Sequence, residues 1–145
     1  MGIELRPGYA VRPLRIGGGL GWSQLEARLV LDPLAFIDGI HDLDLTGGYW
    51  LGSSGYALSA GWRATTLVLD DATEWQHAVL GGALARLPTL GLDGLRALAG
   101  LELSVLLLTH GAGLPAEANC FCDGLGVSET LGFAIFIRME YAAPN

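Results

Sequence analysis

The chain has 145 residues, 51% of them hydrophobic and only 16% charged, which excludes intrinsic disorder and fits one globular domain over residues 1–145. All eight basic residues are arginine, and with 15 acidic residues they give a net charge of −7. The absence of lysine excludes Schiff-base and Walker-type lysine chemistry, and the acidic balance argues against a nucleic-acid-binding surface.

The first part of the chain predicts strands separated by glycine-rich turns. Residues 3–16 predict two extended pieces at a sheet edge, since Pro7 and Pro13 cannot donate backbone hydrogen bonds. Glycines then cluster in 17–21, 47–48 and 52–55, which favours tight turns between short strands; a further pair, 81–82, falls inside the helix predicted below. Residues 25–32 alternate apolar with mostly polar side chains and predict a half-exposed strand.

Further strands are predicted on both sides of the chain's middle. Residues 56–62 alternate in the same way and lead into 65–69, a nearly continuous apolar run that predicts a buried strand. Residues 101–109 predict a second buried strand. The clearest strand is 133–141, where apolar and other side chains alternate strictly over the whole segment.

Two helices are predicted between these strands. Asp71 and Glu74 have the spacing of a capping box, and Trp75, Val79 and Ala83 follow at helical spacing, so residues 71–87 predict the main helix. Residues 92–98 predict a short helix that ends at Gly100. The expected fold is therefore α+β, a mostly antiparallel sheet with both helices packed on one face.

Asp38, His41, Asp42 and Asp44 form the first candidate catalytic group. A histidine among carboxylates can act as a general base or bind a metal. In an extended segment, however, Asp42 and Asp44 lie on one face and His41 on the other. We therefore favour a solvated acidic face here and keep an acid–base site as the alternative.

His110, Cys120 and Cys122 form a candidate metal site. Structural zinc sites use four ligands with two to four residues between cysteines, and this segment has three ligands with shorter spacing. We favour reduced, structural cysteines and expect no metal or other cofactor. The glycine-rich residues 17–23 do not match a phosphate loop, and neither they nor residues 52–55 match a nucleophile elbow. Residues 52–55 resemble both a hairpin turn and a flexible engineered linker.

Four aromatic residues lie close together in a glycine-rich region: Tyr49, Trp50, Tyr56 and Trp62. Tyrosine and tryptophan are enriched at interfaces, so these side chains are candidates for a ligand or partner surface. Cross-strand aromatic pairs inside a sheet are the alternative.

No coherent catalytic set emerges, so we expect a non-enzymatic assembly or interaction protein, such as a virion tail or head subunit or an acidic immunity-type binder. The alternatives are a small α+β enzyme or ligand-binding domain that uses the Asp38–Asp44 segment, and a metal-containing domain. The apolar surplus predicts a homo-oligomer or larger assembly with protein partners. The apolar runs are far shorter than the ~20 residues of a spanning helix, and Glu4 and Arg6 occupy the place of a signal peptide's apolar region. We therefore expect no membrane contact and a location in the cytoplasm, or in a virion assembled there.

Overall fold

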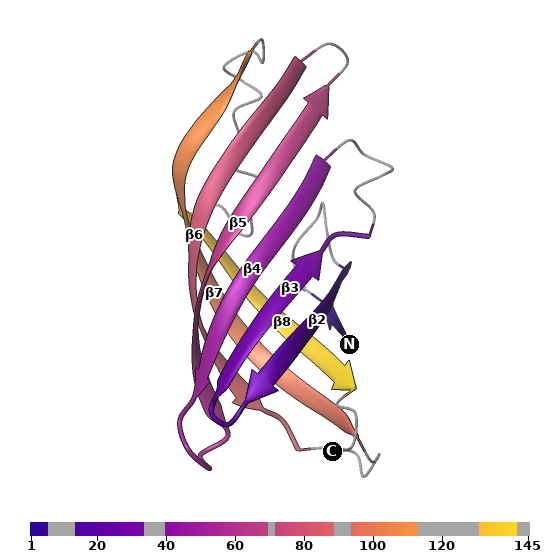
Figure 1. The fold of residues 1–145 in the computed structure, drawn as a ribbon, viewed down its shortest axis with the longest axis vertical. Helices are drawn as coiled ribbons and strands as arrows, with labels where there is room; N and C mark the ends of the chain where they lie inside the picture. The colour runs from indigo at the N-terminus through magenta and orange to yellow at the C-terminus, as the bar shows by residue number, and fades with distance from the viewer. Residues whose placement is uncertain (6–13, 34–39, 70–71, 89–93, 113–130, 142–145) are drawn as a thin grey trace.

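The computed structural model describes residues 1–5, 14–33, 40–69, 72–88, 94–112 and 131–141 of the chain. In these residues eight antiparallel strands each pair with the next in sequence, and β1 pairs with β8 to close a barrel (Figure 1). The strands are β1 (Gly2–Leu5), β2 (Leu14–Trp22), β3 (Leu25–Leu31), β4 (Ile40–Trp50), β5 (Tyr56–Leu69), β6 (Ala72–Arg86), β7 (Leu95–Ala112) and β8 (Leu131–Tyr141).

The predicted α+β fold is wrong, because the described residues form a barrel and contain no helix. The segment predicted as the main helix, 71–87, is strand β6, which pairs with β5 and β7 along its whole length. Trp75, Val79 and Ala83 recur every four residues, which is one helical turn but also two strand periods. All three lie on one face of the strand, so the same pattern fits both structures.

The predicted short helix 92–98 is also wrong from Leu95 onward, where strand β7 begins. The predicted strand 25–32 is confirmed as β3, which ends one residue earlier at Leu31, and 133–141 lies within β8. Residues 56–69 are one strand, β5, and the predicted strand 101–109 is part of the longer β7. Of the glycine clusters, only 52–55 is a turn; the others lie inside strands.

The strands are strongly staggered around the barrel. A row of directly paired residues can be followed around the barrel from β8 to β2. It contains Leu131, Val105, Val79, Trp62, Leu45, Leu29 and Gly18. The register that pairs Gly2 with Gly17 places Gly18 opposite Met1, whose carbonyl accepts a hydrogen bond from the Tyr141 amide. A row of paired residues that starts at Leu131 of β8 therefore returns to β8 at Tyr141, about ten residues along the strand. In an eight-stranded barrel with this stagger, the strands tilt by roughly 35–45° from the barrel axis.

The two ends of the barrel differ in their connections. Residues 23–24, 51–55 and 87–94 join strands at one end, where the Met1 ammonium also donates a hydrogen bond to the Tyr141 carbonyl over 3.2 Å. Residues 6–13, 32–39, 70–71 and 113–130 join strands at the other end. We call these the turn end and the loop end. Residues 113–130 are the longest connection in sequence and belong to the loop end, whereas connections of eight residues occur at both ends.

Strand β7 carries one extra residue relative to β6. His77 pairs with Leu108 and Ala78 with Leu106, so Leu107 has no direct partner on β6. Two residues that face one across a bulge send their side chains to the same side of the sheet. Leu107 and Leu108 are accordingly both exposed on the outer face. The bulge thus keeps the apolar side chains of β7 outside while the register changes.

Gly100 on β7 provides space for the Phe136 ring of β8 inside the barrel. A Cβ atom at position 100 would come within 2.1 Å of that ring, which packs with Ala57 and Leu84. We expect Gly100→Ala to lower the free energy of unfolding by about 1–3 kcal/mol, since overpacking displaces the ring. Urea unfolding checks this. Gly81→Ala, where a Cβ meets nothing within 4 Å, should change stability by less than about 0.5 kcal/mol; equal losses in both variants would contradict the packing argument.

Candidate functional site

The polarity of the barrel is inverted relative to a water-soluble protein. On β8, Ile135, Ile137 and Met139 point outward and are exposed, whereas Arg138 between them points inward and is buried. The same alternation places Leu43 and Leu45 of β4 outside and Asp42 and Asp44 inside. The outer surface and the lumen are therefore the two places where the molecule can meet ligands.

The outer surface is apolar across the strands. Among the described residues, 28 large hydrophobic side chains are exposed. One row of direct partners crosses five strands without a polar side chain: Leu29, Leu45, Trp62, Val79 and Val105. Water-soluble monomers rarely expose a contiguous apolar patch above a few hundred Å². An apolar environment must cover this surface.

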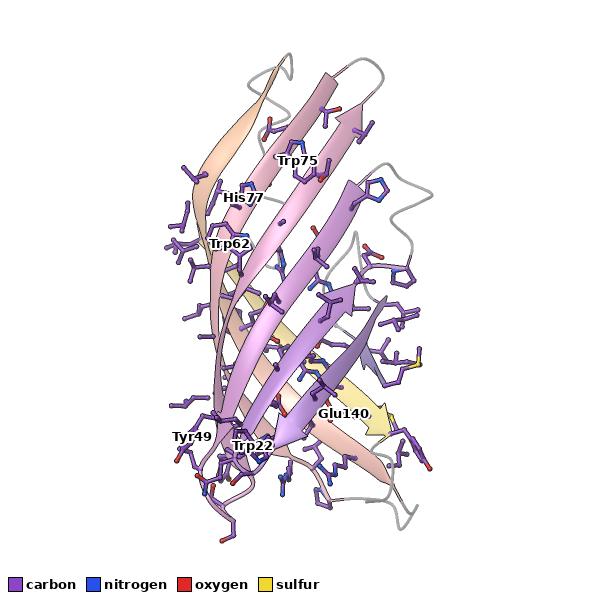
Figure 2. The ribbon with its side chains drawn as sticks, in the orientation of Figure 1. Trp22, Tyr49, Trp62, Trp75, His77 and Glu140 are labelled. Atoms are coloured by element: carbon purple, nitrogen blue, oxygen red, sulfur yellow. The ribbon has the colours of Figure 1, made fainter. Side chains whose placement is uncertain are left out.

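Aromatic side chains mark the limits of the apolar surface. Trp22, Tyr49, Tyr56 and Tyr141 are exposed near the turn end, and Trp75 is exposed toward the loop end (Figure 2). Trp75 pairs with Thr66, which follows Tyr56 on β5 by about ten residues. With a rise of about 3.3 Å per residue and a tilt near 40°, this separation spans roughly 25 Å along the barrel axis. That height equals the apolar band of a membrane-spanning barrel.

The four aromatic residues singled out in the sequence do not form one pocket. Tyr49, Tyr56 and Trp62 are exposed on the outer surface, and the Tyr49 hydroxyl donates a 2.8 Å hydrogen bond to Gln24. Trp50 points into the lumen at the turn end instead, where its indole nitrogen donates a 3.0 Å hydrogen bond to Glu26. The Arg86 guanidinium lies 4.3 Å above the Trp50 ring.

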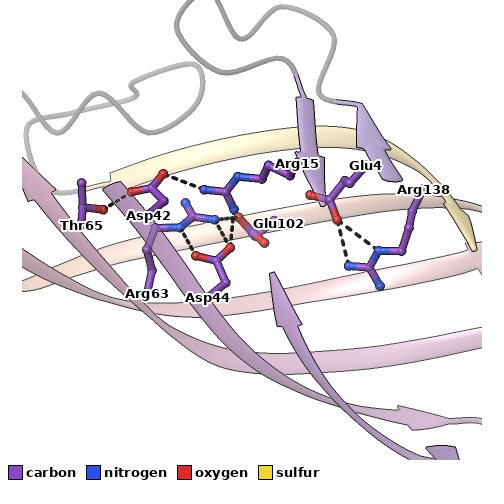
Figure 3. A network of polar contacts seen from close by, with 8 residues as sticks. All are labelled: Glu4, Arg15, Asp42, Asp44, Arg63, Thr65, Glu102 and Arg138. Atoms are coloured by element: carbon purple, nitrogen blue, oxygen red, sulfur yellow. Dashed lines mark hydrogen bonds and ion pairs between the residues drawn. The ribbon is translucent and has the colours of Figure 1, made fainter. Parts of the chain in front are cut away.

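A network of buried ion pairs crosses the lumen (Figure 3). Asp44 of β4 accepts two hydrogen bonds from Arg63, at 2.6 and 2.7 Å, and a further one from Arg15 of β2. Asp42 accepts a 2.7 Å hydrogen bond from Arg15 and a 2.5 Å hydrogen bond from the Thr65 hydroxyl. The two carboxylates therefore hold two guanidinium groups between them, and these contacts join β2, β4 and β5 across the lumen.

The network continues toward β7, β8 and β1. Arg63 also donates a 2.9 Å hydrogen bond to Glu102 on β7. In a second group, Arg138 of β8 donates to Glu4 of β1 over 3.0 and 3.1 Å. Arg28 of β3 donates to Glu140 of β8. Multidentate pairs with low exposure are the strong class of ion pairs. Here they connect neighbouring strands, as Arg138 and Glu4 do for β8 and β1, and strands that are not neighbours, as Arg28 and Glu140 do for β3 and β8.

The candidate acid–base group is not assembled in the described residues. Asp42 and Asp44 lie on one face and His41 on the other, as the strand alternation requires. The carboxylates are nevertheless not solvated: Asp42 is 5% and Asp44 2% exposed, and both face arginines in the lumen. His41 belongs to the outer face, which separates it from them. Asp38 lies outside the described residues.

The candidate metal site cannot be placed in the same way. His110 belongs to β7, but its side chain lies outside the described residues, as do Cys120 and Cys122. Within the ranges that the structure describes, no group of three or more histidine, cysteine or acidic side chains has the arrangement of a metal site.

Sequence reasoning missed the lumen network and the arginines that form it. Arg15, Arg28, Arg63 and Arg138 each stand in a strand between apolar neighbours. A single arginine in such a strand is ordinarily a solvent-facing residue. The signal that could have revealed them is their repetition. Four strands each carry one arginine among apolar residues, and β1 and β4 carry acidic residues that alternate onto the same, inward-facing side of the sheet.

Comparison of the chain with protein-family models, curated proteins and solved structures gave no match. No helix among the described residues is long and apolar enough to cross a membrane.

Proposed function

We propose that the protein is a membrane-embedded barrel whose outer surface contacts lipid acyl chains and whose lumen is filled by ion-paired side chains. The observation that carries this proposal is the inverted polarity: apolar side chains cover the outside while arginines and carboxylates are buried inside. A closed barrel satisfies every backbone group between strands, which hydrocarbon requires. This proposal replaces the sequence-based expectation of a protein without membrane contact.

The strand lengths and the aromatic residues support the same environment. Strands β4 to β8 have 11 to 18 residues, and a tilted strand needs about 9–11 to span the hydrocarbon core. Tryptophan and tyrosine prefer the membrane–water interface because one end of the ring system is apolar and the other polar. The exposed aromatic residues near the turn end and Trp75 toward the loop end lie at the heights where the two membrane–water interfaces would be.

The lumen supports an anchoring or scaffolding role in preference to an open pore. Arg15, Arg63 and Asp44 meet near the barrel axis, and Trp50, Leu84 and Phe136 occupy its interior nearer the turn end. Eight-stranded barrels are only wide enough for side chains to fill the interior. We therefore propose that the barrel acts as an anchor or scaffold in the membrane, with its interior filled by side chains.

Depth-dependent fluorescence quenching tests the membrane proposal. Single-tryptophan variants retain either Trp62, which faces outward, or Trp50, which faces the lumen. After refolding into phosphatidylcholine vesicles whose acyl chains carry bromine, Trp62 should be strongly quenched because it contacts those chains. Trp50 is the matched control and should be quenched little, since the barrel wall separates it from lipid.

The competing explanation is that another protein covers the apolar surface, as in a shell or tail assembly. That explanation predicts a soluble, monodisperse assembly in lipid-free buffer and no difference in bromine quenching between Trp62 and Trp50. This result would overturn the membrane proposal.

A further inference from the structure

Strand β2 extends past the described residues of β1 toward the turn end. β1 pairs with β2 only from Leu14 to Gly17, whereas β2 continues along β3 to Trp22. Among the described residues, none pairs with residues 19–22 on the side of β2 that faces β1. Backbone groups on an unpaired edge are not tolerated inside hydrocarbon. This part of β2 must therefore lie at the polar headgroup level or be covered.

A hollow of about 150 Å³ lies beside this edge and is lined from both faces of the wall. Leu20 and Tyr141 border it from the outer face, while Arg28, Arg96, Glu26 and Glu140 border it from the lumen side. The hollow is smaller than the roughly 300–1,000 Å³ of sites that enclose a drug-sized molecule. It is therefore suited to one small polar group that enters from the outer surface.

Inward-facing glycines leave the space for this hollow. Gly17, Gly19 and Gly21 pair with Val30, Arg28 and Glu26, so by register they face the lumen without side chains. A Cβ at Gly17 would come within 3.2 Å of the Arg28 Nε atom. Glycine at these positions lets the Arg28 side chain and the hollow share the inner wall.

Arg28 is the buried group that points to a ligand. Its side chain is 7% exposed and donates to Glu140 through one terminal nitrogen only. Its Nε and second terminal nitrogen are buried with no hydrogen-bond partner. Buried donors of a charged group are almost always satisfied, and leaving them unsatisfied is costly. An acceptor oxygen bound in the hollow would remove that cost.

We propose that this hollow binds the headgroup of a phospholipid that carries both a phosphate and an amine, such as phosphatidylethanolamine. Arg28 and Arg96 would donate to the phosphate, and Glu26 and Glu140 would accept from the ammonium. Two arginines and two glutamates line the hollow, so a headgroup with both charges fits better than a purely anionic one. The acyl chains would lie outside along Leu20 and Tyr141. This inference rests on the proposed membrane function.

Lipid retention measured by native mass spectrometry tests the proposal. The full chain, folded in uncharged maltoside micelles, is mixed with phosphatidylethanolamine, phosphatidylglycerol or phosphatidylcholine. We expect each chain to retain one molecule of phosphatidylethanolamine. Phosphatidylglycerol lacks the ammonium group, so its retention should be about tenfold lower, which corresponds to the loss of one charge contact. Gly21→Val should abolish retention, because a side chain there fills the hollow while its Cβ meets only the Leu25 carbonyl at 3.9 Å.

Matched variants separate a specific site from general lipid adhesion. Arg96→Gln should reduce retention, whereas Arg86→Gln, at the same end but stacked on Trp50, should not. Gly81→Val adds the same side chain as Gly21→Val on the outer surface and should retain lipid normally. Equal retention in all variants, or displacement of the lipid by millimolar inorganic phosphate alone, would overturn the proposal.

Failure of this inference is distinguishable from failure of the membrane proposal. If Trp62 is quenched by brominated lipid but no phosphatidylethanolamine is retained, the chain is a membrane barrel without this headgroup site. If Trp62 is not quenched, the membrane proposal itself is wrong, and the headgroup site has no basis.

Discussion

Replacing Asp44 with alanine is expected to lower the free energy of unfolding by about 3–5 kcal/mol, the cost of breaking a buried ion pair from one side. Asp44 bonds both Arg15 and Arg63, whose side chains are each 1% exposed. Without the carboxylate, Arg63 loses two hydrogen bonds and Arg15 loses one. Because domains are stable by only about 5–15 kcal/mol, this variant should fold in low yield.

Urea unfolding of the protein in phosphatidylcholine vesicles, followed by tryptophan fluorescence, measures this loss. Glu102→Gln is the matched control, because Glu102 makes one hydrogen bond with Arg63 and is partly exposed. Its loss should stay below about 1.5 kcal/mol. The double variant Asp44→Leu with Arg63→Met should recover part of the stability, since it removes one buried carboxylate and one buried guanidinium together and replaces them with apolar side chains. An Asp44→Ala variant as stable as Glu102→Gln would show that the network does not hold the barrel together.

Replacing Leu45 with arginine should lower the stability of the membrane-inserted barrel by about 2–4 kcal/mol, as a charge at the bilayer midplane does. Leu45 is 58% exposed on the outer surface and lies between Leu29 and Trp62 in the apolar row. On a surface that faces water the same change would cost less than about 0.5 kcal/mol, because it removes no buried contact. The size of the stability loss therefore shows whether the outer surface contacts lipid or water.

Leu51→Arg supplies the control for this measurement. Leu51 is also an exposed leucine, but it follows β4 at the turn end, next to the exposed aromatic residues. A charge at the interface costs only about 0–1 kcal/mol. Both variants are compared with the native chain by urea unfolding in vesicles. If they lose equal stability, the outer surface has no depth profile and does not cross a bilayer.

Local patterns predicted strands correctly where apolar and polar residues alternate without competition. The predicted strand 25–32 agrees with β3 to within one residue, and 133–141 lies within β8. The pattern failed in 71–87, since Trp75, Val79 and Ala83 suit either a helix or a strand and only the pairing of β6 with β5 and β7 decides between them. Glycine was misleading for a related reason. Gly17 and Gly19 lie within strand β2, where they leave room in the barrel wall, and do not form the predicted turn.

The composition and the alternation of residues determined by themselves that the chain is ordered and which side chains share a face, including the placement of Asp42 and Asp44 opposite His41. The sequence pattern did not determine which face of each strand points inward. Alternation of apolar and polar residues looks the same whether the apolar face lies inside or outside the barrel. Closure of the barrel decided it. Closure brings Arg138 to Glu4, 134 residues away, and Arg63 to Asp44 and Glu102, so that buried charges are paired and the apolar side chains are left outside. Pairs so distant in sequence leave no local pattern, and for that reason the lumen and the membrane-facing surface became visible only in the tertiary structure.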